Sequence, residues 1–340
     1  RQAREDVGTG VDPIAKRKNL ASELRSQQLR ETTFKQAATA YIEAHGDSWR
    51  NPKHRAQWTS TLETYVYPVV GSLHVRDVSQ EHVMKILEPI WKTKNETASR
   101  VRGRIESVLD WATVRGYRSG DNPARWKGHL DHLLPAASKV RKVEHRRALS
   151  FSEMPAFMKE LRSQAGMAAK ALEFAILTAA RSGEVRGATW SEIDLDAKLW
   201  TVPAGRMKAN KEHRVPLSDT AVILLKSLPK FEESQMVFFA ARGGQLSDMA
   251  LTQGVRRMGA DAVPHGFRST FRDWAGEATN YPRELAEHAL AHTLDNKVEA
   301  AYRRGDALER RRKMMNDWTK FCGGEAKSSL ADFLTGKPPA

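Results

Sequence analysis

The C-terminal half of this sequence carries side chains whose types suit the handling of a phosphodiester. Arg181 and Arg268 each present a planar guanidinium that stays charged at physiological pH and matches two phosphate oxygens. His265 and His292 carry imidazoles, which suit proton transfer because that ring titrates near neutrality. Tyr302 follows with a hydroxyl that can act as a nucleophile. The set predicts a site that holds a phosphate while a bond to it is broken.

Metal-free cleavage also requires an acid for the leaving oxygen, and a lysine supplies it. Lys208 lies between two short strand-like runs, where a hairpin tip would let a mobile ammonium group swing towards a DNA end. Arg206 and Lys211 are the neighbouring alternatives. The competing interpretation is that all three cations only contact backbone phosphates.

Taken singly, these residues have ordinary explanations. An arginine in a basic chain is usually a surface residue, and a lone histidine is more often structural. Tyr302 lies at apolar helical spacing from Val298, so by itself it would be assigned to a core. Glu184 stands three residues after Arg181, and an ion pair between them would fix either side chain. Only the combination favours catalysis.

A tyrosine needs assistance to attack at neutral pH, because a phenol titrates at about pH 10. Its proton must be removed, and nearby positive charge must stabilise the phenolate. Arg303 and Arg304 would supply that charge together with the two phosphate-binding arginines.

The sequence indicates no metal centre. His288 and His292 at i, i+4 could form a ligand pair, but the zinc-protease pattern HExxH is absent. Cys322 is the only cysteine, which excludes a cysteine-based zinc site and an intramolecular disulfide. We therefore expect neither a metal nor another cofactor, and the cysteine content favours an intracellular protein.

As an ordered set, these residues resemble the tyrosine recombinases, the phage-type integrases. The motifs that carry the resemblance are LTAARSGE, MK followed by HRVPLS, HGFR, LAH and AAYRR. Ala291 stands where the family usually has glycine, and Ala179 and Ala180 depart from the usual pattern before the first arginine. The resemblance covers residues 32 to about 322.

The resemblance implies a role for each residue. Arg181 and Arg268 would hold the phosphate, and Lys208 would protonate the 5′-oxygen that leaves. His265 and His292 would hydrogen-bond the phosphate and manage the tyrosine proton. The nucleophile Tyr302 would form a 3′-phosphotyrosyl link, which conserves the bond energy so that no ATP is needed.

The family also implies an assembly. Four protomers would form a homotetramer on two double-stranded DNA core sites, each protomer closing a C-shaped clamp around DNA. Prophage and genomic-island integrases act in this way to integrate and excise mobile elements, with an accessory DNA-bending or directionality factor as a further partner. Two alternatives remain at this point: a type IB topoisomerase or resolvase with the same chemistry, and a DNA-binding regulator whose tyrosine is inert.

Composition agrees with a polyanion partner. The 340 residues include 55 Lys and Arg against 41 Asp and Glu, a formal net charge of +14, and the isoelectric point is about 9.9. An anionic membrane would call for a concentrated polybasic tail, whereas these charges are spread along the chain. The N-terminus lacks an apolar h-region, so we expect a cytoplasmic, nucleoid-associated protein.

The length accommodates two domains, each with its own core. Apolar residues recur at helical spacing from Phe34 onwards, which predicts a helical core-site DNA-binding domain at 32–128. A catalytic domain is expected at 148–322, mainly α with a small antiparallel β-sheet. Its strand-like runs are Ile193–Leu195, Leu199–Val202 and His213–Leu217.

Three further segments complete the predicted organisation. Residues 1–31 are expected to be a connector from a truncated N-terminal arm-binding domain, because the chain starts at Arg1 and GVDPIAKRK resembles the end of such a domain. A basic linker at 129–147 is either a solvated tether or a strap that follows DNA. Its DNA-binding candidates are Lys139, Arg141, Lys142, Arg146 and Arg147. The tail at 323–340 follows a final helix whose apolar stripe is Leu308, Met315, Trp318 and Cys322, and it could dock on its own protomer or on a neighbour.

Overall fold

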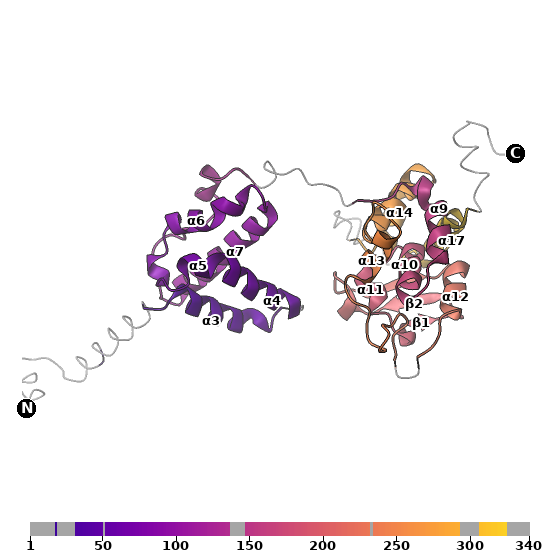
Figure 1. The fold of residues 1–340 in the computed structure, drawn as a ribbon, viewed down its shortest axis with the longest axis horizontal. Coiled ribbons are helices and arrows are strands. Elements are labelled where there is room, and N and C mark those ends of the chain that lie inside the picture. The colour runs from indigo at the N-terminus through magenta and orange to yellow at the C-terminus, as the bar shows by residue number, and fades with distance from the viewer. Residues whose placement is uncertain are drawn as a thin grey trace, which may run out of the picture. The chain divides into compact units, whose positions relative to one another are not determined.

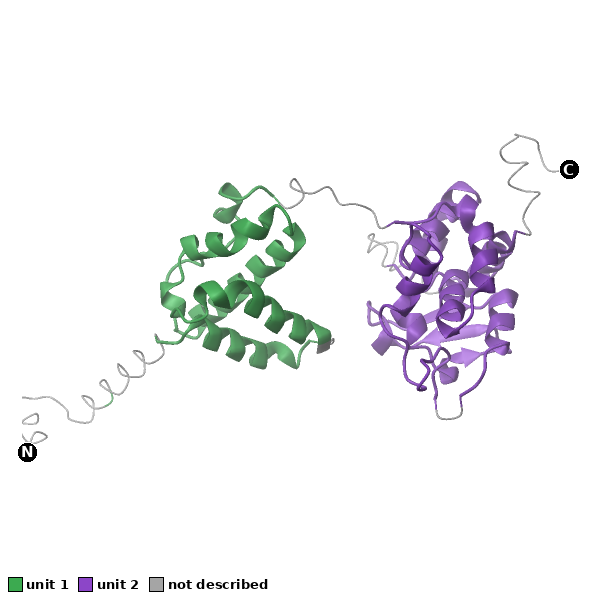
Figure 2. Cartoon of the chain, viewed as in Figure 1, with its two compact units in different colours: residues 1–144 green, residues 145–340 purple. Residues whose placement is uncertain are grey.

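The computed structural model describes residues 31–49, 52–136, 147–231, 234–292 and 306–324, together with Lys18. The chain divides into two compact units, residues 1–144 and 145–340 (Figure 2). Several predicted site residues lie outside the described residues: Lys139, Arg141, Lys142, Arg146 and Tyr302.

Unit 1 is helical throughout its described residues (Figure 1). Its elements are α3 (Phe34–Gly46), α4 (Pro52–Thr61), the π-helix η1 (Leu62–Val66), α5 (Tyr67–Val70), the 3₁₀ turn η2 (Val75–Asp77), α6 (Gln80–Trp91), α7 (Asn95–Val114) and the 3₁₀ turn η3 (Leu130–His132).

Local sequence sets where these helices begin. Thr33 and Gln36 form a capping box at the start of α3, and Ser79 and His82 form one at the start of α6. The helical periodicity predicted from the sequence is confirmed, because its positions line one continuous core. The fully buried members include Phe34, Leu62, Val66, Val83, Leu87, Ile105, Val108 and Leu109.

A hydrogen bond and a ring contact of Trp91 hold the C-terminal end of unit 1 against its helices. The indole of Trp91, at the end of α6, donates a 2.9 Å hydrogen bond to the carbonyl of Pro135 and stacks on Trp126 with ring centroids 5.5 Å apart. The segment after α7 is therefore folded back onto the helices of the same unit.

Unit 2 combines helices with a small sheet (Figure 1). Its helices are α9 (Met154–Ser163), α10 (Met167–Thr178), α11 (Ser182–Arg186), α12 (Asp219–Lys226), α13 (Ala250–Arg257), α14 (Gly266–Glu277), α15 (Arg283–Ala289) and α17 (Leu308–Gly323), with 3₁₀ turns η4 (Phe151–Glu153), η5 (Trp190–Glu192) and η6 (Ala204–Arg206). Its strands are β1 (Ile193–Asp194), β2 (Leu199–Val202) and β3 (His213–Pro216).

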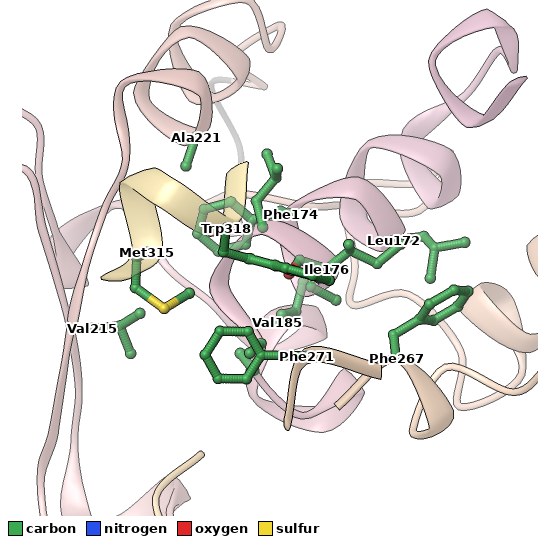
Figure 3. Packing of buried hydrophobic residues seen from close by; sticks show 14 of the residues in the cluster. Leu172, Phe174, Ile176, Val185, Val215, Ala221, Phe267, Phe271, Met315 and Trp318 are labelled. Carbon is green, nitrogen blue, oxygen red and sulfur yellow. The ribbon is translucent and has the colours of Figure 1, made fainter. Parts of the chain in front are cut away.

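Helix α10 is the centre of unit 2. It packs against α9, α11, α12, α13 and α17, and it is apolar on nearly every side, as expected for a helix surrounded by others. Figure 3 shows Phe174 and Ile176 of α10 beside Trp318 of α17. The Trp318 indole donates a 2.9 Å hydrogen bond to the carbonyl of Ile176, which fixes α17 on α10.

The predicted strands are confirmed as one antiparallel sheet of order β1-β2-β3. Trp200 of β2 pairs with Ile193 of β1 and with Val215 of β3. Side chains alternate along β2, so that Trp200 and Val202 are buried while their neighbours are partly exposed. The chain is thus mainly α with one small antiparallel sheet, as expected.

The final helix also follows the prediction. Met315, Trp318 and Cys322 are buried along one stripe of α17, and Leu308 is partly exposed. Gly324 ends the helix with φ +79, a left-handed conformation that costs glycine little.

One glycine permits a close approach between the start of unit 2 and α14. A Cβ on Gly266 would lie 2.1 Å from the carbonyl oxygen of Arg147. The same short segment is held by two hydrogen bonds, from the Val263 amide to the Arg147 carbonyl at 3.2 Å and from the Thr270 hydroxyl to the Leu149 carbonyl at 2.7 Å.

We expect Gly266→Ala to destabilise unit 2 by about 1–3 kcal/mol, because the added methyl group forces backbone to move. Gly276→Ala is the matched control on the same helix, since its Cβ would meet nothing within 4 Å. Alanine there should be neutral or stabilising by up to about 1 kcal/mol. Urea unfolding measures both effects, and equal midpoints for the two variants would refute the steric account.

Candidate active site

Two helix C-termini and two helix N-termini meet where the sequence predicted a phosphate site. α10 ends at Ala179, which is left-handed with φ +51, and Arg181 follows at the start of α11. Arg268 lies in the first turn of α14. α15 ends at Leu290, shortly before His292. Residues far apart in the sequence thus reach one place.

Arg181 is held by a carboxylate at its own helix. Its Nη1 donates to Glu184 Oε1 at 2.7 Å, and its amide donates to Glu184 Oε2 at 3.0 Å. Its Nη2 lies 3.5 Å from the Leu290 carbonyl and 3.3 Å from that of Ala291. Glu184 is buried while the Arg181 side chain is partly exposed. The carboxylate therefore fixes the orientation of a guanidinium group that a ligand can still reach.

Arg268 joins the two helix ends. It is 5% exposed, and it donates from Nη1 to the Ala179 carbonyl and from Nη2 to the Leu290 carbonyl at 2.6 Å. The two acceptors are carbonyls of the residues that cap the C-termini of α10 and α15. Carbonyls at a helix C-terminus have no partner within the helix and attract positive charge. Both guanidiniums therefore share the Leu290 oxygen and must be neighbours.

The charge of Arg268 survives its burial. Burial lowers the pKa of this guanidinium to about 10, the positive charge of Arg181 acts in the same direction, and Glu184 and Glu287 oppose them. The group remains charged at neutral pH. Its Nε is buried without a hydrogen-bond partner among the described residues, so one donor is still to be satisfied.

His292 is oriented by a carboxylate that sequence reasoning missed. Its Nδ1 lies 2.6 Å from Glu287 Oε2, and its Nε2 lies 3.2 Å from Arg268 Nη2. A carboxylate accepts only, so Nδ1 carries the proton and Nε2 accepts from the arginine in the neutral ring. Glu287 is 8% exposed and also forms an ion pair with Arg272 at 2.8 Å. Its position five residues before His292 offered no local sequence signal.

The remaining predicted residues lie just before α14 and in the connection between β2 and β3. His265 directly precedes α14 and is exposed. Lys208 is exposed in the turn between β2 and β3, as predicted, and forms no ion pair with a described residue. Arg206, one of its alternatives, instead donates to the Glu192 carboxylate and the Glu184 carbonyl. Arg206 therefore has a structural role, and Lys208 and Lys211 stay exposed.

A histidine that the sequence did not single out lies next to the arginines. Burial lowers the pKa of His213, the first residue of β3, to about 4; Arg311 and Arg181 lower it too, while Glu184 and a hydrogen bond to the Ala289 backbone raise it. His213 is therefore neutral at physiological pH, although charged groups surround it.

The described residues contain neither a membrane-spanning helix nor a group of metal ligands. No helix within it is long and apolar enough to cross a membrane. The same residues contain no group of three or more His, Cys, Asp or Glu side chains placed to hold a metal ion.

Comparisons with known proteins agree with the predicted resemblance. Residues 34–129 match the phage integrase central domain, and residues 147–309 match the phage integrase family. The integrase of Enterobacteria phage P4 is 30% identical over 94% of this chain and 75% of its own length. Prophage integrase IntZ of Escherichia coli K12 is 30% identical over 93% of this chain and 77% of its own length.

Solved structures share the fold. A lambda integrase dimer bound to a core site matches with a TM-score of 0.64 at 16% identity, covering 84% of this chain and 81% of that one. A lambda integrase tetramer on a Holliday junction matches with a TM-score of 0.63 at 16% identity, covering 82% of each chain. At this identity the likeness concerns the fold alone.

The low pKa of His213 predicts a loss of stability in mild acid. Between pH 6.5 and about 4 the unfolded chain binds a proton that the folded chain does not, so stability falls as pH drops through that window. From pH 7 to pH 5 the loss should be about 2 kcal/mol. Urea unfolding of wild type and His213→Gln at both pH values checks this: the glutamine variant should lose less, and identical losses would contradict it.

Proposed function

This chain belongs to the phage integrase family of tyrosine recombinases, and we propose that Tyr302 is the nucleophile of its strand exchange. The protein is a site-specific recombinase that cleaves and rejoins DNA. The observation that carries the residue assignment is the convergence of Arg181, Arg268 and His292 within hydrogen-bond distance of shared atoms. Tyr302 lies outside the described residues, and its assignment rests on the family motif AAYRR.

In this mechanism Arg181 and Arg268 bind the non-bridging oxygens of the scissile phosphate. Each now donates to neutral carbonyls, and an anion accepts stronger, charge-assisted hydrogen bonds. As the nucleophile adds, charge grows on these oxygens, and fixed guanidiniums stabilise that charge without reorganising.

The histidines manage protons around the same phosphate. Glu287 keeps the proton of His292 on Nδ1, which leaves Nε2 as the atom that faces the arginine and the ligand. His265, which directly precedes α14 and stands three residues before Arg268, is the second imidazole of the proposed site.

The bond changes balance without a cofactor. The Tyr302 oxygen bonds to phosphorus as its proton passes to an imidazole of the site, His265 or His292, and the bond from phosphorus to the 5′-oxygen breaks. Lys208 gives that oxygen a proton from the exposed β2–β3 turn. A 5′-hydroxyl from a partner duplex then attacks the 3′-phosphotyrosyl link and releases the tyrosine.

DNA is held, in this proposal, by charge spread over the whole chain. The net charge of +14 favours a polyanion, and the helical domain at 32–128 and the linker residues at 139–147 would contact the core site. Arg147 is exposed and pairs with Asp261. Integration and excision of a mobile element would take place in the cytoplasm, at the nucleoid, on a homotetramer with accessory DNA-bending factors.

Tyr302→Phe tests the nucleophile. Wild type should form a covalent adduct with a nicked suicide duplex, and the variant should form none while binding the intact duplex equally well, because only one hydroxyl is removed. Denaturing gels measure the adduct and a mobility-shift titration measures binding. An adduct with the phenylalanine variant, or none with wild type, would reject the assignment.

Arg181→Lys tests whether the planar guanidinium, with its two parallel donors, is required. A lysine keeps the charge but cannot donate to two phosphate oxygens in one plane, so single-turnover adduct formation should slow about 100-fold. Arg186→Lys is the control on the same helix, since Arg186 pairs with Asp248 at 2.5 Å. Equal rates for the two lysine variants would show that charge alone suffices.

A further inference from the structure

Arg206 reaches two other elements of unit 2 from a position next to the proposed proton donor. It is the last residue of η6 and stands two positions before Lys208. Its Nη1 donates to the carboxylate of Glu192, the last residue of η5. Its Nη2 donates to the carbonyl of Glu184 in α11. One guanidinium group therefore joins the connection between β2 and β3 to two separate places on the body of the unit.

The first of these acceptors is fixed by the core. The Glu192 carboxylate also accepts a 3.0 Å hydrogen bond from the indole of Trp200. Trp200 lies fully buried in β2, where its ring packs on Phe174 of α10 with centroids 5.3 Å apart. A carboxylate bound to a core tryptophan has little freedom to move, so it is a rigid attachment point for Arg206.

The second acceptor belongs to the residue that orients the first phosphate-binding arginine. The two carboxylate oxygens of Glu184 accept from the guanidinium and the amide of Arg181. Its carbonyl lies in the last turn of α11, where carbonyls lack partners within the helix. Arg206 provides a donor for that carbonyl. Arg181 and Arg206 thus bind the side chain and the backbone of the same residue.

A glycine leaves room for this contact. Gly187 directly follows α11, and a Cβ built on it would lie 3.2 Å from Arg206 Nη2. That separation is shorter than ordinary van der Waals contact. The guanidinium group therefore packs directly on the backbone at the end of the helix.

The connection that carries Lys208 depends on such side-chain contacts. β2 ends at residue 202 and β3 begins at residue 213, so the strand ladder does not include residues 203–212. Met207 is buried in the core and gives the connection one attachment to the body of unit 2. A single apolar contact leaves the backbone able to pivot about it. The two hydrogen-bonded contacts of Arg206 restrict that rotation.

We propose that Arg206 is a positioning residue that holds Lys208 in place to protonate the leaving 5′-oxygen. The proposal rests on the proposed role of Lys208 as the proton donor. A lysine ammonium group sits on a flexible four-carbon stem, so its backbone decides which atoms it can reach. Arg206 sets that backbone relative to α11, and α11 carries Arg181 at its start.

The size of the effect follows from what proton donation contributes. A positioned general acid accelerates a reaction by about 10²- to 10⁴-fold. Without Arg206 the lysine is still present and Met207 still anchors the connection, so only part of that factor is lost. We therefore expect Arg206→Met to slow adduct formation about tenfold.

The test uses two nicked duplexes that differ in one atom, with oxygen or sulfur at the 5′-bridging position of the scissile phosphate. A thiol titrates at about pH 8.5, far below an alcohol, so a 5′-sulfur leaves as a thiolate without being protonated. The Tyr302 oxygen bonds to phosphorus, the bond from phosphorus to sulfur breaks, and sulfur keeps the electron pair. A variant impaired only in proton donation should be slow on the oxygen duplex and recover on the sulfur duplex.

Arg162→Met is the matched control in the full-length protein. The side chains of Arg162 and Arg206 are 36% and 25% exposed, and each pairs with a largely buried glutamate, Arg162 with Glu173 at 2.7 Å. That pair joins α9 to α10 rather than to the β2–β3 connection. Both variants lose one positive charge and leave one glutamate without its arginine, so duplex affinity and stability should change alike.

Single-turnover adduct formation is measured on both duplexes with the same protein preparation, so any loss of folded protein cancels in the ratio of the two rates. Arg206→Met should be about tenfold slower than Arg162→Met on the oxygen duplex and within about twofold of it on the sulfur duplex. Arg206→Lys, which keeps a donor for one of the two acceptors, should recover part of the rate. Equal rates of the two methionine variants on oxygen overturn the proposal. So does a tenfold defect on both duplexes, which would mean that Arg206 acts through Arg181 or the fold.

Lys208→Ala separates this proposal from the role on which it rests. It should be slow on the oxygen duplex and recover on the sulfur duplex. A defect on both duplexes would refute Lys208 as the proton donor, and the proposal with it. Recovery of Lys208→Ala without recovery of Arg206→Met would keep the donor and reject the positioning role. No adduct with wild type on either duplex would instead refute the nucleophile.

Discussion

Buried guanidinium groups must be solvated by the protein itself, and this requirement organises unit 2. Arg268 and Arg311 are 5% and 1% exposed, and an uncompensated buried charge costs several kcal/mol. Arg268 donates to the carbonyls of Ala179 and Leu290, and Arg311 to that of Arg214. Around Arg268 the carbonyl dipoles satisfy these donors without cancelling the charge, whereas Arg311 also pairs with the Asp306 carboxylate. Arg268 therefore keeps a positive potential for an anion, which a carboxylate partner would have neutralised.

The acceptors are available because helices end there. The last carbonyls of α10 and α15 have no partner within their own helices, and a cation at a helix C-terminus is favourable. Left-handed residues, Ala179 with φ +51 and Ala291 with φ +48, turn the chain at these ends. Where the family usually has glycine, alanine adopts the conformation at a modest cost in strain. Helix termination and the proposed phosphate binding thus depend on the same atoms.

Carboxylates in this unit orient side chains more than they neutralise them. Glu184 directs Arg181, Glu287 directs His292, and Asp306 is directed by two arginines. The first two pairs join a group with proposed chemistry to an element of the rigid core. The geometry of the site therefore depends on how α10, α17 and the sheet pack together. Figure 3 shows the side chains that pack around Trp318.

Periodicity was enough to predict the helical faces of unit 1, the three strands and the last helix, and motif order grouped Arg181, Arg268 and His292, which the structure brings together. These features are local, because a repeat of 3.6 or 2 residues and a turn are written in consecutive positions. The partners of Arg268, the pairing of Glu287 with His292, the burial of Arg311 and the neutral state of His213 were not predictable. They join residues as much as 97 positions apart, and burial and charge state depend on every neighbour that folding brings in. The sequence determined which chemical groups are available. Tertiary packing decided which cations are buried and which carboxylate each of them pairs with. It therefore also decided which cations remain free to bind an anion.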